Sequence, residues 1–370
     1  MTLRPMRPLR TPGLPGAPIE AQTRVEPEDF LVEEVPLSAP SGKGPHLWLQ
    51  VRKRALSTFE VLERLARAVE TEPRHCGHAG LKDKHAITTQ WLSVPSPRGP
   101  RPDWAQFEFE RDGFEVLASE PHHSRLKMGQ LRGNRFRIRL RDADLAASGA
   151  LEQNLSFFER HGVPNWFGEQ RFGSGGRNLE KGLRILHDPQ ARGIRRMRKQ
   201  LVKLLLSSVQ SEVFHHVLTE RLEDTSALEH GDIAWLHHNG ACFLVEDPRE
   251  EQIRAERFEI SPTGPLPGPK MLRAKSEPGE LEQAVFDALG LQPEDFGKLP
   301  FQAAPGARRP LRVRLSETRV EVREPAESEP GQLWIEFTLE RGAFATTVLR
   351  DLLADSPWFD DEPNDSMDRA

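Results

Sequence analysis

Tyrosine is absent from this chain of 370 residues, although phenylalanine occurs 19 times and tryptophan 7 times. A reaction that needs a phenol as its acid or base is therefore excluded. Cysteine is nearly absent too, because Cys76 and Cys242 are too few for a disulfide framework or for a closed zinc site made of cysteines. This cysteine content fits a reducing compartment, and we expect a cytoplasmic protein.

Long apolar runs are also missing. No segment approaches the length that crosses a bilayer, and the basic opening MTLRPMRPLRTPGLPGAP has no apolar core of the kind found in secretory signals. We therefore expect no membrane partner. The repeated prolines predict a disordered leader over residues 1–22, and the acidic composition near the end predicts a loose tail over residues 356–370.

Several motifs of phosphate, acyl-transfer and metal chemistry are missing as well. Neither a P-loop nor the G-x-S-x-G turn of hydrolases occurs. His75, Cys76 and His78 stand close together, but no fourth ligand follows at a suitable spacing. The pairs at 215–216 and 237–238 have the same defect, and we expect no metal site.

The net charge is −5, from 51 Lys and Arg against 56 Asp and Glu, which alone argues against a nucleic-acid partner. The basic residues are nevertheless concentrated on LRGNRFRIRLR (131–141), where arginines alternate with apolar residues, and at the start of a helical segment (192–222). Such local concentration lets a net-acidic protein follow a phosphate backbone, although ordinary surface charge is the common alternative. The candidate phosphate-binding residues are Arg137, Arg139, Arg195 and Arg196.

The order of the expected elements predicts an α+β protein with an insertion. Strands are expected at 25–37, 46–54, 131–141, 310–322 and 333–340, and the middle of the chain is richer in helices. A capping box at Ser57 and Glu60 starts a helix over 57–70, with Phe59 and Leu62 on its apolar face. We predict a discontinuous domain of residues 23–159 and 309–355, and an inserted domain of residues 160–308.

One carboxylate stands between two lysines in GLKDKHAITTQW, where Lys82, Asp83 and Lys84 follow a glycine loop and precede a strand. A solvated turn is the common interpretation of such a run. However, flanking cations favour the ionised form of a carboxylate, and glycine lets the backbone approach a ligand closely. An ionised, positioned carboxylate suits a nucleophile better than a proton shuttle.

Six segments occur in one order: GLKDKHAITTQW, GNRF, GVPNWFGEQRFG, SPTGPLPG, RRPL and RGAFATTVLRDLL. Together they resemble the TruD family of tRNA pseudouridine synthases, over nearly the whole chain from Arg24 to Leu353. Trp166 stands where the family is expected to have a tyrosine. The resemblance implies a pseudouridine-synthase-like catalytic domain, with a largely antiparallel mixed sheet flanked by helices, and an inserted α/β domain.

The same resemblance implies a function. A member of this family converts uridine, at position 13 of certain transfer RNAs, to pseudouridine without cofactor or metal, and we expect a monomer that binds tRNA. A factor that binds or folds RNA without modifying it is the alternative. From the residues alone, Phe30, Phe136 and Phe344 would be core. The resemblance instead gives roles to seven residues: Asp83 as nucleophile, Phe30, Asn134 and Phe344 as substrate contacts, Phe136 as the ring that packs on the base, Arg24 as the ion-pair partner of Asp83, and Lys82 in support.

Overall fold

The computed structural model describes residues 5–97, 99–189, 193–298, 304–325 and 330–355, without the side chain of Arg195. Two compact units form. The large-sheet unit comprises Gly16–Glu159 and Leu315–Gly342, and the α5 unit comprises Arg160–Arg314 with the described parts of Met1–Pro15 and Ala343–Ala370. The domain boundaries expected from the sequence stay a prediction, and residues 343–355 lie in the α5 unit. The tail expected over 356–370 lies outside the described residues.

The large-sheet unit contains an eight-stranded sheet in the order β13-β14-β6-β1-β4-β2-β5, with β3 paired to β4. All described pairs in it are antiparallel except β1 with β4, which are parallel. The α+β class with a largely antiparallel sheet is therefore confirmed. The strands are β1 (Phe30–Pro36), β2 (His46–Arg54), β3 (Gly77–His78), β4 (Ile87–Pro95), β5 (Phe114–His122), β6 (Leu131–Leu140), β13 (Leu315–Arg323) and β14 (Gln332–Glu340).

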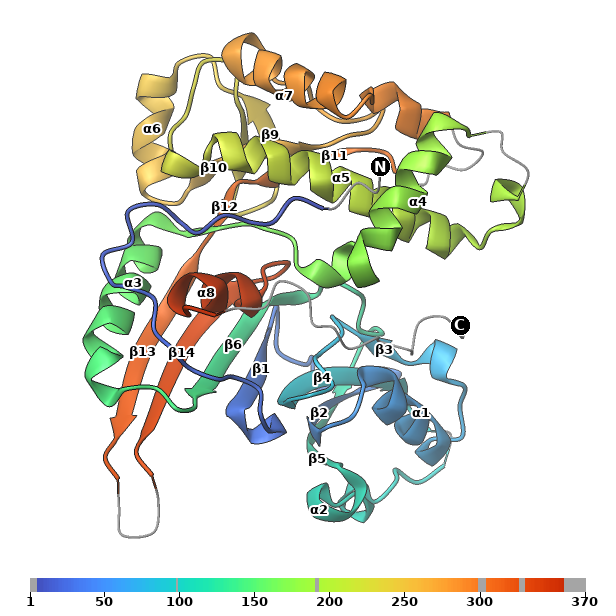
Figure 1. Ribbon diagram of the computed structural model, residues 1–370. Coiled ribbons are helices and arrows are strands. Elements are labelled where there is room, and N and C mark those ends of the chain that lie inside the picture. Colours follow the sequence, from blue (N-terminus) through green and yellow to red (C-terminus); the bar gives the residue numbers. More distant parts are fainter. Residues whose placement is uncertain (1–4, 98, 190–192, 299–303, 326–329, 356–370) are drawn as a thin grey trace. The chain divides into compact units, whose positions relative to one another are not determined.

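Three α-helices accompany this sheet among the residues described: α1 (Thr58–Ala68), α2 (Phe109–Asp112) and α3 (Ser148–His161). Helix α1 starts at the capping box of Ser57 and Glu60, as the sequence predicts, and packs against the sheet near β2 and β4 (Figure 1). Its buried face is formed by Val61, Leu62 and Leu65, whereas Phe59 is 56% exposed. The placement of Phe59 on the apolar face is therefore wrong.

The α5 unit is built around a helix that is buried along most of its length (Figure 1). Helix α5 is apolar on several sides, and it contacts α4, α7 and β10. A Cβ on Gly182 of α4 would lie 2.4 Å from the carbonyl oxygen of Leu205, so only glycine permits this approach of the two helices. The elements of the unit are α4 (Arg177–His187), α5 (Lys199–Glu220), α6 (Pro248–Glu256), α7 (Ser276–Ala288), α8 (Ala345–Leu352), a sheet of β8 (Ile233–Leu236), β9 (Cys242–Leu244), β10 (Ile260–Leu266) and β11 (Ala307–Pro310), and the pair β7 (Val163–Pro164) with β12 (Arg312–Val313).

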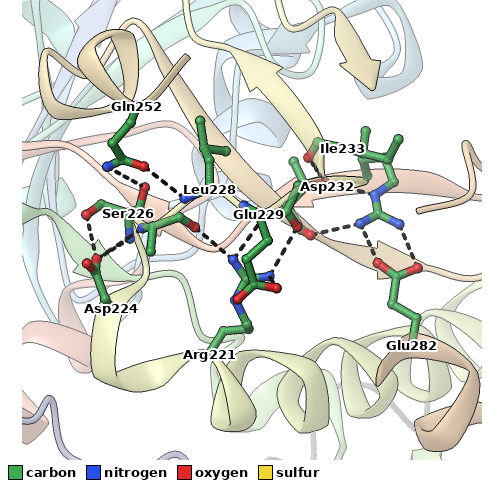
Figure 2. Close-up of polar contacts among 12 residues, drawn as sticks. Arg221, Asp224, Ser226, Leu228, Glu229, Asp232, Ile233, Gln252 and Glu282 are labelled. Atoms are coloured by element: carbon green, nitrogen blue, oxygen red, sulfur yellow. Dashed lines mark hydrogen bonds and ion pairs between the residues drawn. The ribbon is translucent and has the colours of Figure 1, made fainter. Parts of the chain in front are cut away.

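Two arginines in the α5 unit whose side chains are largely shielded from solvent have carboxylate partners. Arg308 of β11 forms a two-pronged pair with Glu282 of α7, with nitrogen–oxygen distances of 2.6 and 3.0 Å. Arg221, at the end of α5, reaches both oxygens of Asp232 at 3.1 Å (Figure 2). These pairs fasten the sheet to the helices, and they neutralise charges that would be costly to bury alone.

Residues 5–22 make specific contacts, in place of the disorder expected for a leader. The backbone N–H of Met6 donates to Glu212 at 2.9 Å, and Gly16 exchanges two hydrogen bonds with the side chain of Asn154. Gln22 pairs with the backbone of Arg141. Composition suggests disorder because the segment has few apolar residues, but buried polar side chains from distant positions supply the partners that hold it.

Within the described residues, no helix combines the length and apolar character needed to cross a bilayer.

Replacing Glu282 with glutamine should lower the free energy of unfolding by about 3 kcal/mol, because the guanidinium of Arg308 would stay buried without a counter-charge. Urea unfolding at neutral pH measures this change. The matched control is Glu294→Gln, which breaks the exposed pair with Arg273 and should cost less than about 1 kcal/mol. Similar losses in the two variants would show that the buried pair is not a major support of the α5 unit.

Candidate functional site

The loop that carries Asp83 joins β3 to β4 and leads into the start of β4. Strands β1 and β4 are parallel, with Leu31 opposite Ile87. Because parallel strands start at the same end of a sheet, this loop lies near the start of β1 at Phe30. Asp83 is exposed, and the chain becomes buried again at Ala86. The loop therefore presents the carboxylate of Asp83 at this end of the sheet.

A buried lysine of β2, the strand next to β4, forms hydrogen bonds with the backbone of this loop. The ammonium of Lys53 in β2 donates to the backbone carbonyl oxygens of Asp83 and Leu56, each at 2.7 Å. Lys53 is 1% exposed, and no carboxylate lies within ion-pair distance of it in the described chain. Burial lowers the pKa of Lys53 to about 8, against the opposing attraction of Asp83.

The two lysines that flank Asp83 are each paired with another carboxylate. Lys82 forms an ion pair of 2.7 Å with Glu34 of β1, and both side chains are almost completely buried. Lys84 lies 3.6 Å from Glu60 at the surface. Asp83 itself has no ion-pair partner among the described residues. Of the three alternating charges, Lys82 is therefore buried and Lys84 is exposed, and Asp83 between them is exposed without an ion pair.

A hydroxyl from helix α1 completes the anchoring of the loop. Thr58, the first residue of α1, accepts from the backbone N–H of Lys82 at 3.1 Å and donates to Gln90 at 3.0 Å. The amide of Gln90 reaches back to the carbonyl oxygen of Gly80 at 3.4 Å. The backbone on both sides of Asp83 is thus fixed to α1, β2 and β4.

The register of β1 and β6 brings three of the predicted substrate-contacting residues to one face of the sheet. Phe136 lies opposite Val32, and Asn134 lies opposite Glu34. The rings of Phe30 and Phe136 pack edge to face with centroids 6.0 Å apart. Both rings are buried in this arrangement, and the side-chain oxygen of Asn134 is buried without a hydrogen-bond partner.

Arg24 lies over the ring of Phe30, with the guanidinium carbon 4.2 Å from the ring centroid. No ion pair joins Arg24 to Asp83, although both residues belong to the described chain. Arg24 has φ of +60°, a conformation that costs energy in a residue with a side chain, and its Nε is buried without a partner. In this state Arg24 covers Phe30, and the pairing with Asp83 stays a prediction.

The arginines of β6 project from the face opposite Phe136. Arg137 pairs with Glu321 at 2.9 Å and with Glu336 at 3.0 Å, and it lies over the ring of Trp334. Its charge is therefore already neutralised, and its surroundings do not support a phosphate contact. Arg139 is half-buried on the same face and has no ion-pair partner in the described part of the chain.

The remaining predicted residues lie in the α5 unit. Phe344 precedes α8, is 37% exposed, and packs over Gly168, where a Cβ would lie 3.7 Å from its ring. Arg196 is exposed at the end of a short 3-10 helix (Ile194–Arg196). The side chain of Arg195 lies outside the described part of the chain.

A buried histidine holds the WFG segment next to Phe344. The ring nitrogen Nε2 of His215 in α5 accepts from the backbone N–H of Phe167 at 2.9 Å. Burial lowers the pKa of His215 to about 3, so the ring stays neutral and can accept. Of the histidine pair at 215–216, His215 thus has a structural role, which is to hold the backbone of Phe167.

In the parts of the chain that are described, no three His, Cys, Asp or Glu side chains are arranged to hold a metal ion. The expectation of no metal and no cofactor stays a prediction.

Sequence reasoning did not identify Lys53 or Glu34 as parts of this site. A signal for Lys53 was present, because it continues the alternation of Leu47, Leu49 and Val51, all fully buried on that strand. A lysine at the next position of an apolar strand face indicates a buried charge with a partner. Glu34 gives a similar signal after Phe30 and Val32.

Comparison with known proteins assigns the family. The family model of tRNA pseudouridine synthase D (TruD) matches residues 14–189 and 176–352. The chain belongs to the TruD family. Among curated relatives, the tRNA pseudouridine synthase D of Syntrophotalea carbinolica is 36% identical over 93% of this chain and 98% of its own, and that of Thermus thermophilus is 40% identical over 95% and 94%. The resemblance inferred from the six segments is confirmed.

A solved structure shows the same fold. The putative TruD of Methanosarcina mazei superposes with a TM-score of 0.73, covering 93% of this chain and 95% of its own, at 23% sequence identity. The predicted TruD-type α+β architecture is therefore confirmed by shape as well as by sequence.

The Lys53→Met variant should loosen the loop around Asp83. Each hydrogen bond from an ammonium contributes about 1.5 kcal/mol or more, so amide hydrogen exchange across residues 79–86 should accelerate about tenfold or more. The exposed Lys43→Met is the control and should leave this segment unchanged. Unaltered exchange at 79–86 in Lys53→Met would mean that the ammonium does not hold the loop.

The His215 site predicts an acid-sensitive fold. Its folded pKa lies below the unfolded value of about 6.5, so its contribution is complete above pH 6.5 and is lost as the pH falls toward 3. At pH 5 the loss should be about 2 kcal/mol relative to neutral pH. Urea unfolding of His215→Asn should show a smaller fall between pH 7.5 and 5 than the parent protein, whereas the exposed His238→Asn should behave like the parent. An equal fall in His215→Asn would contradict the assignment.

Proposed function

We propose that this chain isomerises uridine in transfer RNA to pseudouridine, with the carboxylate of Asp83 as nucleophile. Its family membership supports the reaction, and one structural observation supports the residue. Asp83 has an exposed carboxylate without an ion-pair partner, and its backbone is fixed by Lys53, Lys82 and Thr58. A nucleophile needs both properties, because the substrate must be able to reach it and because a side chain that is already ordered loses little conformational entropy when the reaction begins.

The reaction needs no external reagent. Asp83 attacks the nucleoside, at C1′ of the sugar or at C6 of the base, and the bond between C1′ and N1 breaks. The uracil rotates, and a bond forms between C1′ and C5. The proton on C5 is released, N1 gains a proton, and the carboxylate is regenerated. The atoms of substrate and product are the same, which is consistent with a site made only of protein side chains.

Lys53 places a positive charge near Asp83. The buried ammonium of Lys53 contacts the carbonyl oxygen of the same residue and has no other negative group at ion-pair distance in the described chain. A positive charge in a desolvated position attracts a nearby carboxylate more strongly than one in water. Lys53 is therefore a cation close to Asp83, and the pairing of Arg24 with Asp83 stays a prediction.

Substrate binding would have to change the aromatic packing. The target base must leave its stack, at a cost of a few kcal/mol, and a ring that receives it must have a free face. Phe136 is 5% exposed, and Arg24 covers Phe30. We infer that the base displaces part of this packing to reach Phe136, where the unpartnered oxygen of Asn134 can accept from the N3–H of uracil.

The finer details of the proposal come from the family. We assign uridine 13 of tRNA as the target, no cofactor, a monomeric enzyme and a cytoplasmic location. Phe344 is retained as a substrate contact, because its ring is partly exposed beside the WFG segment. Arg139 and Arg196, whose side chains have no ion-pair partner in the described chain, remain the better candidates for phosphate contacts than Arg137.

Asp83→Asn should abolish pseudouridine formation, lowering the rate by at least about a thousandfold while tRNA binding changes by less than about threefold. The asparagine keeps the size of the side chain but is a poor nucleophile. Product is measured by release of tritium from C5-labelled uridine in tRNA, without added cofactor. The control is Asp142→Asn, an exposed carboxylate at a positive φ that asparagine tolerates.

The same assay separates the second candidate function, an RNA-binding or RNA-folding factor. A parent protein that binds tRNA and releases no tritium would favour that factor. Substantial turnover by Asp83→Asn would instead keep the enzyme and remove Asp83 as its nucleophile.

A further inference from the structure

A cavity of about 380 Å³ in the α5 unit has no role in the chemistry proposed above. Its polar lining consists of Arg171, Lys203, Ser207 and Gln210, and none of its lining residues is acidic. The walls come from α5, the end of β10 at Leu266 and the segment 304–307 that enters β11. Two of the six family segments, GVPNWFGEQRFG and SPTGPLPG, thus contribute residues to one cavity.

Arg171 has an unused hydrogen-bonding edge in this cavity. Its Nη1 donates to the hydroxyl of Ser207 at 3.2 Å, and the guanidinium carbon lies 5.1 Å from the ring centroid of Phe167. Its Nε and Nη2 have no hydrogen-bond partner in the described chain, and neither nitrogen is completely closed off from solvent. These two nitrogens are therefore open to the cavity, and they form the side of a guanidinium that binds phosphate with two parallel hydrogen bonds.

The charge of Arg171 is not neutralised, unlike that of the buried arginines described above. Arg221 meets Asp232 (Figure 2), and Arg308 meets Glu282. No carboxylate lies within 4 Å of Arg171 in the described chain. Burial lowers the pKa of Arg171, which is the expected cost of desolvating a cation without a counter-ion. Burial, and then the charge of Arg171, lower the pKa of the neighbouring Arg309 to about 9.

Lys203 adds a second cation to the lining of the cavity. It is exposed on α5 and has no ion-pair partner among the residues described. The cavity thus combines a fixed, planar donor edge with a mobile ammonium and a hydroxyl. An anion with several acceptor oxygens can bind both the guanidinium edge and the ammonium, whereas the hydroxyl of Ser207 already donates to the carbonyl oxygen of Leu204 at 2.8 Å and serves to hold Arg171. A volume of this size is within the range of ligand pockets.

We propose that this cavity binds a phosphate group of the RNA backbone, between the Nε–Nη2 edge of Arg171 and the ammonium of Lys203. The inference rests on the proposed function, because tRNA is the phosphate-bearing polymer that this chain would meet. Backbone phosphates contribute affinity and register without reading sequence. The site would therefore position the RNA on the α5 unit irrespective of its sequence.

The test is the salt dependence of tRNA binding, measured by filter binding between 50 and 300 mM KCl. Lys203→Gln should weaken binding about tenfold at low salt and reduce the slope of log Kd against log salt by about 1. Arg171→Lys, which keeps the charge and loses the planar edge, should weaken binding with less change in slope. Lys181→Gln, an exposed lysine of α4 outside the cavity, is the matched control.

If Lys203→Gln and the control have the same affinity and slope, the proposal is overturned, and because Lys203 is exposed this result does not depend on a folding defect. Inorganic phosphate, titrated by thermal shift, gives the second arm. Stabilisation by phosphate that Lys203→Gln abolishes, with tRNA binding unaltered, would make this a site for free phosphate and would overturn the RNA assignment.

The tritium-release assay on the parent protein keeps this result separate from the proposed activity. Normal turnover with an unaltered slope in Lys203→Gln removes the site and keeps the enzyme. A changed slope without turnover in the parent protein keeps the site and removes the enzyme.

Discussion

The arrangement of the candidate site depends on one buried ammonium group. Lys53 is buried, and its ammonium donates to two backbone carbonyl oxygens, one of them in the residue proposed as nucleophile. Removing a cation from water is costly, and this cost is offset only while the loop keeps the shape that brings those oxygens to the ammonium. The buried charge of Lys53 therefore favours one conformation of the loop, and this conformation fixes the position of the Asp83 side chain.

Cations that are shielded from solvent differ in whether a carboxylate neutralises them. In the α5 unit, Arg308 meets a carboxylate and is fully neutralised, so its contribution is structural. Lys53 and Arg171 lack such partners, and each contributes positive potential to its surroundings: Lys53 to a carboxylate of the chain, and Arg171 to an open cavity. Lys53 and Arg171 thus differ from Arg308 in having no carboxylate partner within ion-pair distance in the described chain.

The sequence predicted the architecture well where a local pattern determined it. The alternation of β6 and the capping box at Ser57 were sufficient, because each depends on neighbours a few residues away. Asp83 was predicted from its loop motif and from the family resemblance, and its role stays a prediction. Lys53 and Glu34 were missed because their partners are set by strand pairing, and the pairing of β1 with β4 in parallel cannot be derived from the strands themselves. Contacts across the sheet likewise decided that Arg137 meets Glu321 and Glu336.

The hydroxyl of Thr58 has a consequence for how this region moves. Thr58 belongs to two structures, because it is the first residue of α1 and its hydroxyl accepts from the N–H of Lys82 in the loop. If the first turn of α1 unwinds, the loop loses a partner in the same event, and the buried amide of Gln90 loses another. Opening of the helix start is therefore coupled to opening of the loop that carries Asp83, so that a ligand that orders either part also protects the other.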